Sequence, residues 1–158
     1  MCYAVPLSDG SYGIAQAGAA MMTNAIYVAL FADHYRELPN QPLHLTFASA
    51  VALATTRRQA LNGGEWLSLW HESEVFPKAA FSNERFSSNG YVGAMVYDAG
   101  ILVDFLSAYH GLLPWNVMND PDYYDRILIA SVERPKSAII LNTEECAKYR
   151  REALGVDV

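Results

Sequence analysis

The sequence opens with Tyr3-Ala-Val-Pro-Leu7, continues with Ser8-Asp9-Gly10, and then reads Ser11-Tyr-Gly-Ile-Ala-Gln16. The two outer runs have strand character. The Ser-Asp-Gly stretch between them supplies a turn former and a residue that tolerates positive φ, which is typical of a β-hairpin. We therefore expect the chain to begin with two antiparallel strands, and this pair sets the kind of sheet that the rest of the chain extends.

Further strand patterns follow the hairpin over the N-terminal two-thirds of the chain. β-branched and aromatic residues or period-2 alternation predict strands at 26–31, 43–47, 66–70 and 91–97. Residues 50–57 fit a strand or a helix, and we favour a strand. Residues 82–90 are rich in Ser and Asn and are expected to form an exposed loop.

The pattern changes to helical spacing after residue 98. Apolar side chains recur at 101, 102, 105, 106 and 109, with Gly111 in the position of a helix C-cap. Asp120-Pro121 predicts a helix start, residues 138–141 a short strand, and Asn142 with Glu145 a capping box for a last helix to about Leu154. Strands first and helices later predict an α+β fold in a single domain, 1–158. We expect a curved antiparallel sheet or partly open barrel, with two or three helices from the C-terminal third.

Composition and charge restrict the function classes. The 158 residues are 52% hydrophobic and 18% charged, with a formal net charge of −6. An acidic chain is a poor ligand for nucleic acid but permits a basic protein partner. The most apolar window, 14–31, contains polar residues and is too mixed to span a membrane. The N-terminus has no basic region ahead of an apolar stretch, so we expect no signal peptide and a cytoplasmic protein.

Motifs for catalysis are absent from the sequence. The histidines His34, His44, His71 and His110 share no metal-binding spacing, and there is no P-loop, GxGxxG or GxSxG. The motifs therefore predict no catalytic residue, metal site or cofactor, although ligands distant in sequence can converge in space. Cys2 becomes an N-terminal nucleophile if Met1 is removed; the alternative is a small residue that begins a strand. Glu72 and Glu74 could act as a general acid–base pair; the alternative is that both are solvated carboxylates in a loop.

The most unusual feature is the stretch 86–125, which has no Lys or Arg but several Asp and aromatic residues. Aromatic anchors with a rim of one charge sign are typical of a protein interface. The alternative is that Trp115 fills the core while the aspartates cap a helix. On the first interpretation, the residues that bind a partner are Trp115, Asp120, Asp122, Tyr123, Tyr124 and Asp125.

The first half of the chain resembles immunity protein family 26, a group of small bacterial proteins tied to polymorphic toxin systems. The resemblance covers roughly residues 3–90 and rests on Pro6-Leu7, Gly10, Tyr12-Gly13 and Gly64-Glu-Trp66. The Gly-Asp that the family usually has upstream of the first strand is absent. The resemblance implies a protein that neutralises a cognate toxin domain, a nuclease or other basic effector, by occluding its active site.

Sequences that resemble this family also carry the label of a small phosphotriesterase, which implies an alternative function. A divalent ion would then activate water for hydrolysis of a phosphotriester or related ester. Its ligands would come from the four histidines together with an Asp or Glu.

Overall fold

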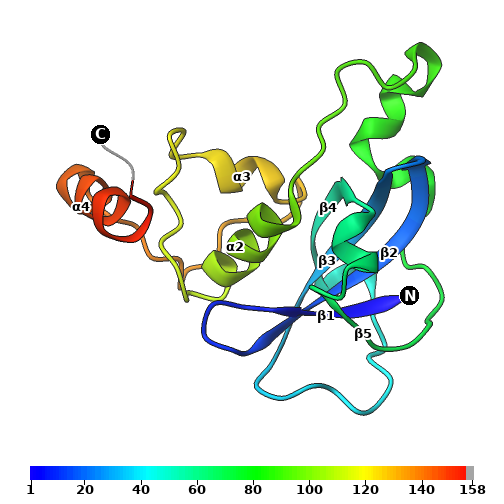
Figure 1. Cartoon of the computed structure of the whole chain (residues 1–158), viewed down its shortest axis with the longest axis horizontal. Helices are drawn as coiled ribbons and strands as arrows, with labels where there is room; N and C mark the ends of the chain where they lie inside the picture. Colours follow the sequence, from blue (N-terminus) through cyan, green and yellow to red (C-terminus); the bar gives the residue numbers. More distant parts are fainter. Residues whose placement is uncertain (156–158) are drawn as a thin grey trace.

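The computed structural model describes residues 1–155 and contains an open antiparallel sheet with helices from the C-terminal part of the chain (Figure 1). The strands are β1 (Cys2–Pro6), β2 (Tyr12–Met22), β3 (Ala25–Tyr35), β4 (Ala50–Arg57) and β5 (Leu67–Ser68), in the order β4-β3-β2-β1-β5. The α-helices are α1 (Gln59–Asn62), α2 (Ala99–Tyr109), α3 (Tyr123–Ile127) and α4 (Thr143–Ala153). Three 3₁₀ segments are η1 (Phe47–Ser49), η2 (Lys78–Ala80) and η3 (Ser82–Asn89).

The hairpin predicted from the opening of the sequence forms. β1 and β2 pair antiparallel from Cys2 with Gln16 to Pro6 with Tyr12. Gly10 has a φ of +84°, which favours glycine because this conformation brings no Cβ into a clash. Shifts of register between β2 and β3, and between β3 and β4, bend the sheet. The predicted α+β fold with a curved antiparallel sheet is thus confirmed, and the sheet does not close into a barrel.

Each face of the sheet is covered by a different part of the chain. Val28 and Leu30 point to the face that packs against Phe105 and Leu106 of α2. Ala29 and Phe31, which alternate with Val28 and Leu30 along β3, point to the opposite face. The residues that cover this second face come from connecting segments and include Leu43, Leu45, Leu69, Trp70, Val75 and Phe76.

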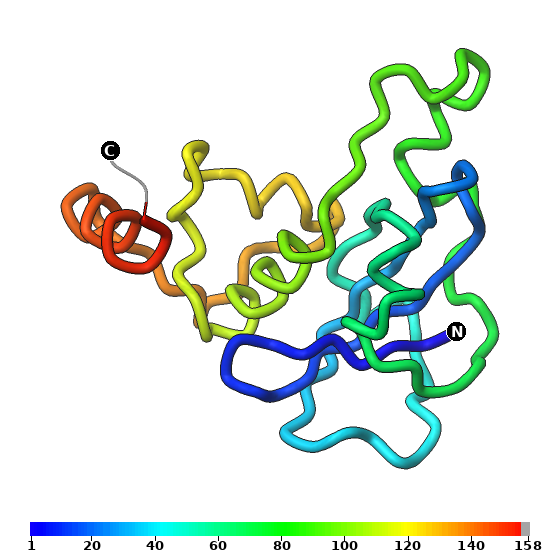
Figure 2. Tube along the Cα trace, viewed as in Figure 1, coloured from blue at the N-terminus to red at the C-terminus, as the bar shows by residue number. Residues whose placement is uncertain are grey.

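The C-terminal helices extend away from the sheet in one direction. α2 lies against the sheet, α3 lies beside α2, and α4 lies at the far edge of the molecule, as the colours of the chain trace also show (Figures 1 and 2). The capping box predicted for α4 is present: the Asn142 side chain accepts from the Glu145 amide at 2.8 Å, and the Glu145 carboxylate accepts from the Asn142 amide at 3.1 Å. Within residues 1–155, no helix has both the length and the apolarity that crossing a bilayer requires.

Several predicted elements differ from the structure. Residues 43–45 form a loop rather than a strand, and 91–97 contribute only one bridge, from Tyr97 to Thr56. Residues 138–141 likewise contribute only a bridge, from Ile139 to Pro114. Segments 91–97 and 138–141 thus pair with a neighbour at one bridge only, and the Leu43 amide bonds the Glu72 side chain instead of a strand, so alternation of side chains does not become a ladder in any of the three. Residues 82–90, predicted as a loop, contain η3.

Candidate functional site

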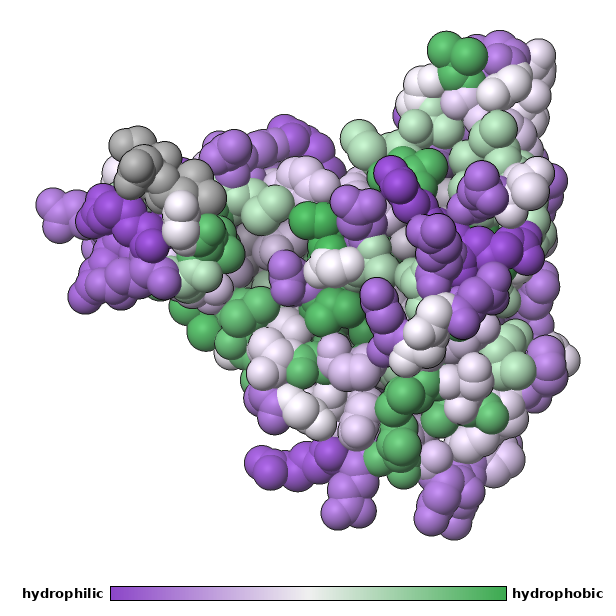
Figure 3. Space-filling model, viewed as in Figure 1, coloured by the Kyte–Doolittle hydropathy of each residue, from purple (hydrophilic) through white to green (hydrophobic). Residues whose placement is uncertain are grey.

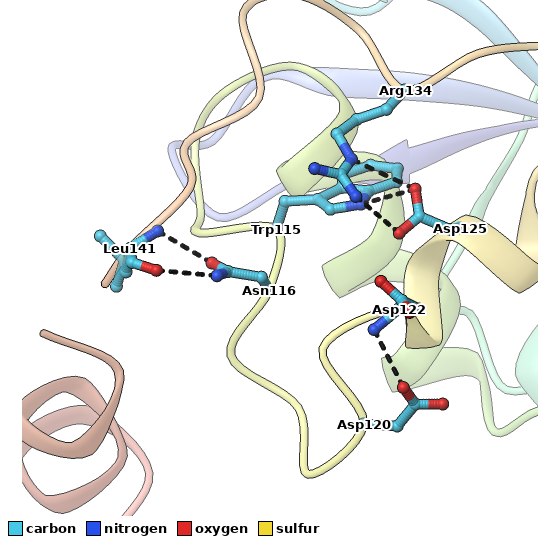
Figure 4. Close-up of polar contacts among 7 residues, drawn as sticks. All are labelled: Trp115, Asn116, Asp120, Asp122, Asp125, Arg134 and Leu141. Carbon is cyan, nitrogen blue, oxygen red and sulfur yellow. Dashed lines mark hydrogen bonds and ion pairs between the residues drawn. The ribbon is translucent and has the colours of Figure 1, made fainter. Parts of the chain in front are cut away.

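The predicted interface lies on the chain between α2 and the end of α3. Residues 138–141 hold the backbone of this segment in place. The Trp115 amide donates a hydrogen bond to the Ile139 carbonyl at 2.8 Å. The Asn116 side chain pairs with both backbone groups of Leu141, at 2.8 and 2.9 Å (Figure 4). These bonds fix the position of Trp115 and of the turn that leads to α3.

Trp115 and Tyr124 are core residues, which corrects their prediction as anchors for a partner. The Trp115 side chain is fully buried and Tyr124 is 3% exposed. Their ring centroids lie 5.5 Å apart, and both rings pack against Phe105 of α2 at 5.8 and 5.9 Å. Aromatic groups of this size gain more free energy from burial against the sheet and α2 than from exposure, so they close the core between α2 and α3.

Asp125 is also engaged within the protein. Its Oδ1 accepts a hydrogen bond from the Trp115 indole at 3.3 Å, and the Arg134 guanidinium binds both carboxylate oxygens at 3.2 and 2.9 Å (Figure 4). A bidentate pair of this kind neutralises the carboxylate. Asp125 therefore attaches α3 to the core and is a weak candidate for direct contact with a partner.

Asp120 and Asp122 form the turn at the start of α3. Asp120 Oδ1 accepts from the Asp122 amide at 3.0 Å, while its other oxygen pairs with Arg126. The Asp122 side chain is exposed and forms no ion pair with any residue in the range 1–155. Of the three predicted interface aspartates, Asp122 is the one whose charge stays available to a partner.

Tyr123 sits beside Asp122 and is partly exposed. Its ring meets Tyr97 edge to face, with centroids 6.3 Å apart. Tyr97 is followed by the exposed Asp98. The Asp98 Oδ1 atom lies 3.7 Å from Nε of Arg57 in β4. We call the group Tyr97, Asp98, Asp122 and Tyr123 the tyrosine surface. Over α3 and the neighbouring segment, hydrophilic and hydrophobic groups interleave (Figure 3).

Sequence reasoning missed the two arginines that neutralise the aspartates. Arg126 and Arg134 lie just beyond the stretch without Lys or Arg, and both fold back onto it. Arg126 lies six residues after Asp120, outside the three- or four-residue spacing at which side chains meet on a helix, so the sequence gives no signal for the first pair. No local pattern indicates the second pair, because Arg134 reaches Asp125 across a turn.

The histidines do not converge on a metal centre. His34 and His110 stack on each other with ring centroids 4.2 Å apart, whereas His44 and His71 lie on separate exposed segments. Within residues 1–155, no three His, Cys, Asp or Glu side chains are arranged to hold a metal ion. The donor set that a metal-assisted hydrolase requires is therefore not assembled in the described part of the chain.

The other candidate catalytic residues have structural roles. Cys2 is fully buried, and burial together with the nearby Glu72 raises the pKa of its thiol, so the thiolate needed for nucleophilic attack is disfavoured. Glu72 Oε1 accepts from the Leu43 amide at 2.7 Å and from the Trp70 indole at 3.1 Å. Burial alone would raise the pKa of Glu72, but these hydrogen bonds outweigh it and hold the pKa below its ordinary value.

The cavity next to the tyrosine surface is small. It lies between β4, α3 and residues 81–97, has a volume of about 70 Å³, and is lined by Thr55, Asn83, Tyr97 and Arg126 among others. Sites for small-molecule substrates usually measure about 300–1,000 Å³. The cavity has room for ordered solvent and is smaller than a typical substrate site.

Comparison with known proteins gave no match to a family model, a curated protein or a solved structure.

Proposed function

We propose that this protein is a non-catalytic binding protein that neutralises a basic toxin domain by covering its active site. The observation that carries the proposal is the exposed, unpaired carboxylate of Asp122 next to the partly exposed ring of Tyr123 on the tyrosine surface. The net charge of −6 and the resemblance of residues 3–90 to an immunity family support the same function.

Asp122, which is exposed, and Tyr123, which is partly exposed, have complementary roles in this proposal. Active sites that bind phosphate are rich in Lys and Arg, so a free carboxylate at the rim attracts such a partner and speeds association. A tyrosine that is half-buried before binding loses little side-chain freedom when it docks. Asp122 therefore steers the partner, and Tyr123, supported by Tyr97, anchors it.

The buried members of the predicted set support this surface from below. Trp115, Tyr124 and Asp125 fix the orientation of α3, and Asp120 fixes the turn that displays Asp122. We therefore expect substitutions of these residues to affect binding through stability, and substitutions at Asp122 and Tyr123 to affect binding directly.

The experiment begins with affinity capture from a lysate of the source cell at low and at high salt. Association rates with the captured toxin are then measured for wild type, Asp122→Asn, Tyr123→Ala and the control Glu74→Gln, which removes one exposed charge on a distant loop. At low salt we expect Asp122→Asn to slow association several-fold and to weaken its dependence on salt. Tyr123→Ala should chiefly speed dissociation.

Equal low-salt association rates for Asp122→Asn and Glu74→Gln would show that net charge alone matters, and would exclude this surface. Wild-type kinetics for both Asp122→Asn and Tyr123→Ala would exclude it as well.

A further inference from the structure

The turn of the β1–β2 hairpin packs against the end of α2 (Figure 1). The Ser8 amide donates to the Ser107 hydroxyl at 3.2 Å, which joins the turn to the helix. Gly13 comes so close that an added Cβ would lie 3.0 Å from Leu106 Cδ1. This contact holds the first strands of the sheet to the helix that leads to Trp115 and α3.

Four polar side chains from three elements meet at this contact: Asp9, Ser11, His34 and His110. The Ser11 hydroxyl contacts Asp9 Oδ1 and lies 2.7 Å from His34 Nε2. The His34 ring, at the end of β3, stacks on His110 at the end of α2, with centroids 4.2 Å apart and planes 17° from parallel. A strand and a helix that are distant in sequence are thus joined through two imidazole rings.

The two histidines differ in their surroundings. His34 is exposed, whereas His110 is half-buried, and its Nε2 is enclosed without a hydrogen-bond partner among residues 1–155. Burial, with a smaller contribution from His34, lowers the pKa of His110 from 6.5 to about 4. The closed arrangement therefore excludes a proton from His110 at pH values where an exposed histidine accepts one.

The cluster is not suited to nucleophilic catalysis. Ser11 is 4% exposed, so a substrate cannot reach its hydroxyl. Its carboxylate partner contacts the serine rather than the histidine, and the Ser11 amide is already bonded to Asp9 at 2.9 Å. An oriented base and a free oxyanion donor are both missing at this position.

We propose that His34 and His110 form a pH-sensitive latch that holds the β1–β2 hairpin against the end of α2 at neutral pH and releases it on acidification. The latch does not depend on the proposed binding of a toxin. When the contact opens, His110 becomes hydrated and takes up one proton. When it closes, that proton must leave, because the ring returns to a buried position 4.2 Å from His34.

Four titratable groups lie near the two histidines in sequence or in space: one on the hairpin, one next to His110, and two residues that flank His34 on β3. Asp9 faces it from the hairpin and favours positive charge on His110, but less strongly than burial disfavours it. Tyr109 meets the His110 ring edge to face at 5.3 Å. Asp33 and Tyr35 flank His34 on β3, where alternation directs them to the opposite face of the sheet.

The size of the response follows from the uptake of one proton per opening. Between about pH 6.5 and about pH 4, the ratio of open to closed molecules rises up to about tenfold for each unit that the pH falls. This opening separates the hairpin turn from the end of α2 and leaves the strand pairs of the sheet in place. The amides at the contact therefore lose protection from hydrogen exchange before those of the sheet.

Hydrogen exchange of the full chain, corrected for intrinsic rates, tests the latch between pH 7 and pH 5. The reporter is the amide of Ser8, bonded across the contact to the Ser107 hydroxyl at 3.2 Å, because opening of the contact breaks this bond. In wild type we expect its protection factor to fall up to about tenfold per unit below about pH 6.5, and to stay below those of the β2–β3 amides. His110→Phe keeps a stacking ring without a titrating group and should flatten this slope. The control His71→Gln, an exposed site, should keep it.

An unchanged slope in His110→Phe would overturn the latch, and so would equal protection of latch and sheet amides, which would indicate global opening. If His110→Phe fails to fold, NMR titration of the His110 ring in wild type decides. Titration below pH 5 supports the latch, and titration at pH 6 or above overturns it.

Discussion

The indole nitrogen of Trp115 donates a hydrogen bond to Oδ1 of Asp125, 3.3 Å away, and this bond connects the aromatic core to α3. The same carboxylate is held by Arg134 at 3.2 and 2.9 Å. An acidic residue next to aromatic residues therefore has two different uses in this chain. Asp125 stabilises the position of α3, whereas Asp122, three residues earlier, presents a free charge.

We expect Asp125→Ala to lower the free energy of unfolding by about 1–3 kcal/mol, because the buried indole N–H and the Arg134 guanidinium lose their shared acceptor. Asp122→Ala is the matched control. It removes an exposed carboxylate from the same turn, so its effect should stay within about 0.5 kcal/mol. Urea unfolding followed by tryptophan fluorescence measures both. Equal losses for the two variants would contradict the structural role of Asp125.

The sequence predicted the hairpin and α4 because both are set by local chemistry. The turn Ser8-Asp9-Gly10 needs a residue at positive φ, and Asn142 with Glu145 satisfies the free amides at the start of α4. Each signal lies within four residues, so no knowledge of the tertiary structure is required.

The predicted strand at 43–47 shows where such reasoning fails. Leu43 and Leu45 alternate with polar residues, but the Leu43 amide bonds the Glu72 carboxylate instead of a neighbouring strand. His44 has a φ of +51°, which is incompatible with a strand. A side chain 29 residues away thus determines this backbone, and alternation alone does not reveal it.

The surroundings of the residues in the candidate site also depend on contacts that are distant in sequence. The sequence shows a stretch with aspartates and aromatic rings, but burial of Trp115 depends on packing against Phe105. The charges of Asp120 and Asp125 are cancelled by Arg126 and Arg134, which lie outside the stretch. Composition counts charges along the chain, whereas the ion pairs depend on the path of the chain in space.

Asn83 is expected to hold the segment that carries Tyr97. This buried amide donates to the Thr55 hydroxyl at 2.8 Å and to the Met95 carbonyl at 2.7 Å, and it accepts from the Met95 amide at 3.1 Å. Asn83→Ala should cost about 2–3 kcal/mol of unfolding free energy and speed proteolysis within residues 82–97, since three polar groups lose their partner. Asn89→Ala, an exposed site on the same segment, is the control; equal rates of cleavage would contradict this role.

Two glycines at opposite ends of α2 should respond to alanine in opposite directions. Gly111 has a φ of +74°, and an added Cβ would lie 3.3 Å from the Ser137 carbonyl, so Gly111→Ala should destabilise by about 1–2 kcal/mol. Gly100 lies in the first turn, where a Cβ meets open space. Gly100→Ala should stabilise by about 0.5–1 kcal/mol. Thermal unfolding of both variants measures this. A lower melting temperature for Gly100→Ala would contradict the open environment.

The Glu72 carboxylate should make stability depend on pH in the acid range. Its hydrogen bonds lower the pKa in the folded protein below the ordinary value of 4.5, so the unfolded chain binds the proton more tightly. The stabilisation is therefore present above about pH 4.5 and is lost as the pH falls through the folded pKa. Because the side chain is partly exposed, we expect Glu72→Gln to cost only about 1 kcal/mol at pH 7.

The difference between wild type and Glu72→Gln should then shrink as urea unfolding is repeated from pH 7 down to pH 3. Glu74→Gln removes an exposed carboxylate two residues away and should show little difference from wild type at any pH. A gap between wild type and Glu72→Gln that stays constant across this range would mean that the amide hydrogen bonds of residues 43–45 do not depend on the charge of Glu72. The loop would then be held by its shape and apolar contacts alone, through Leu43 and Leu45 against the sheet.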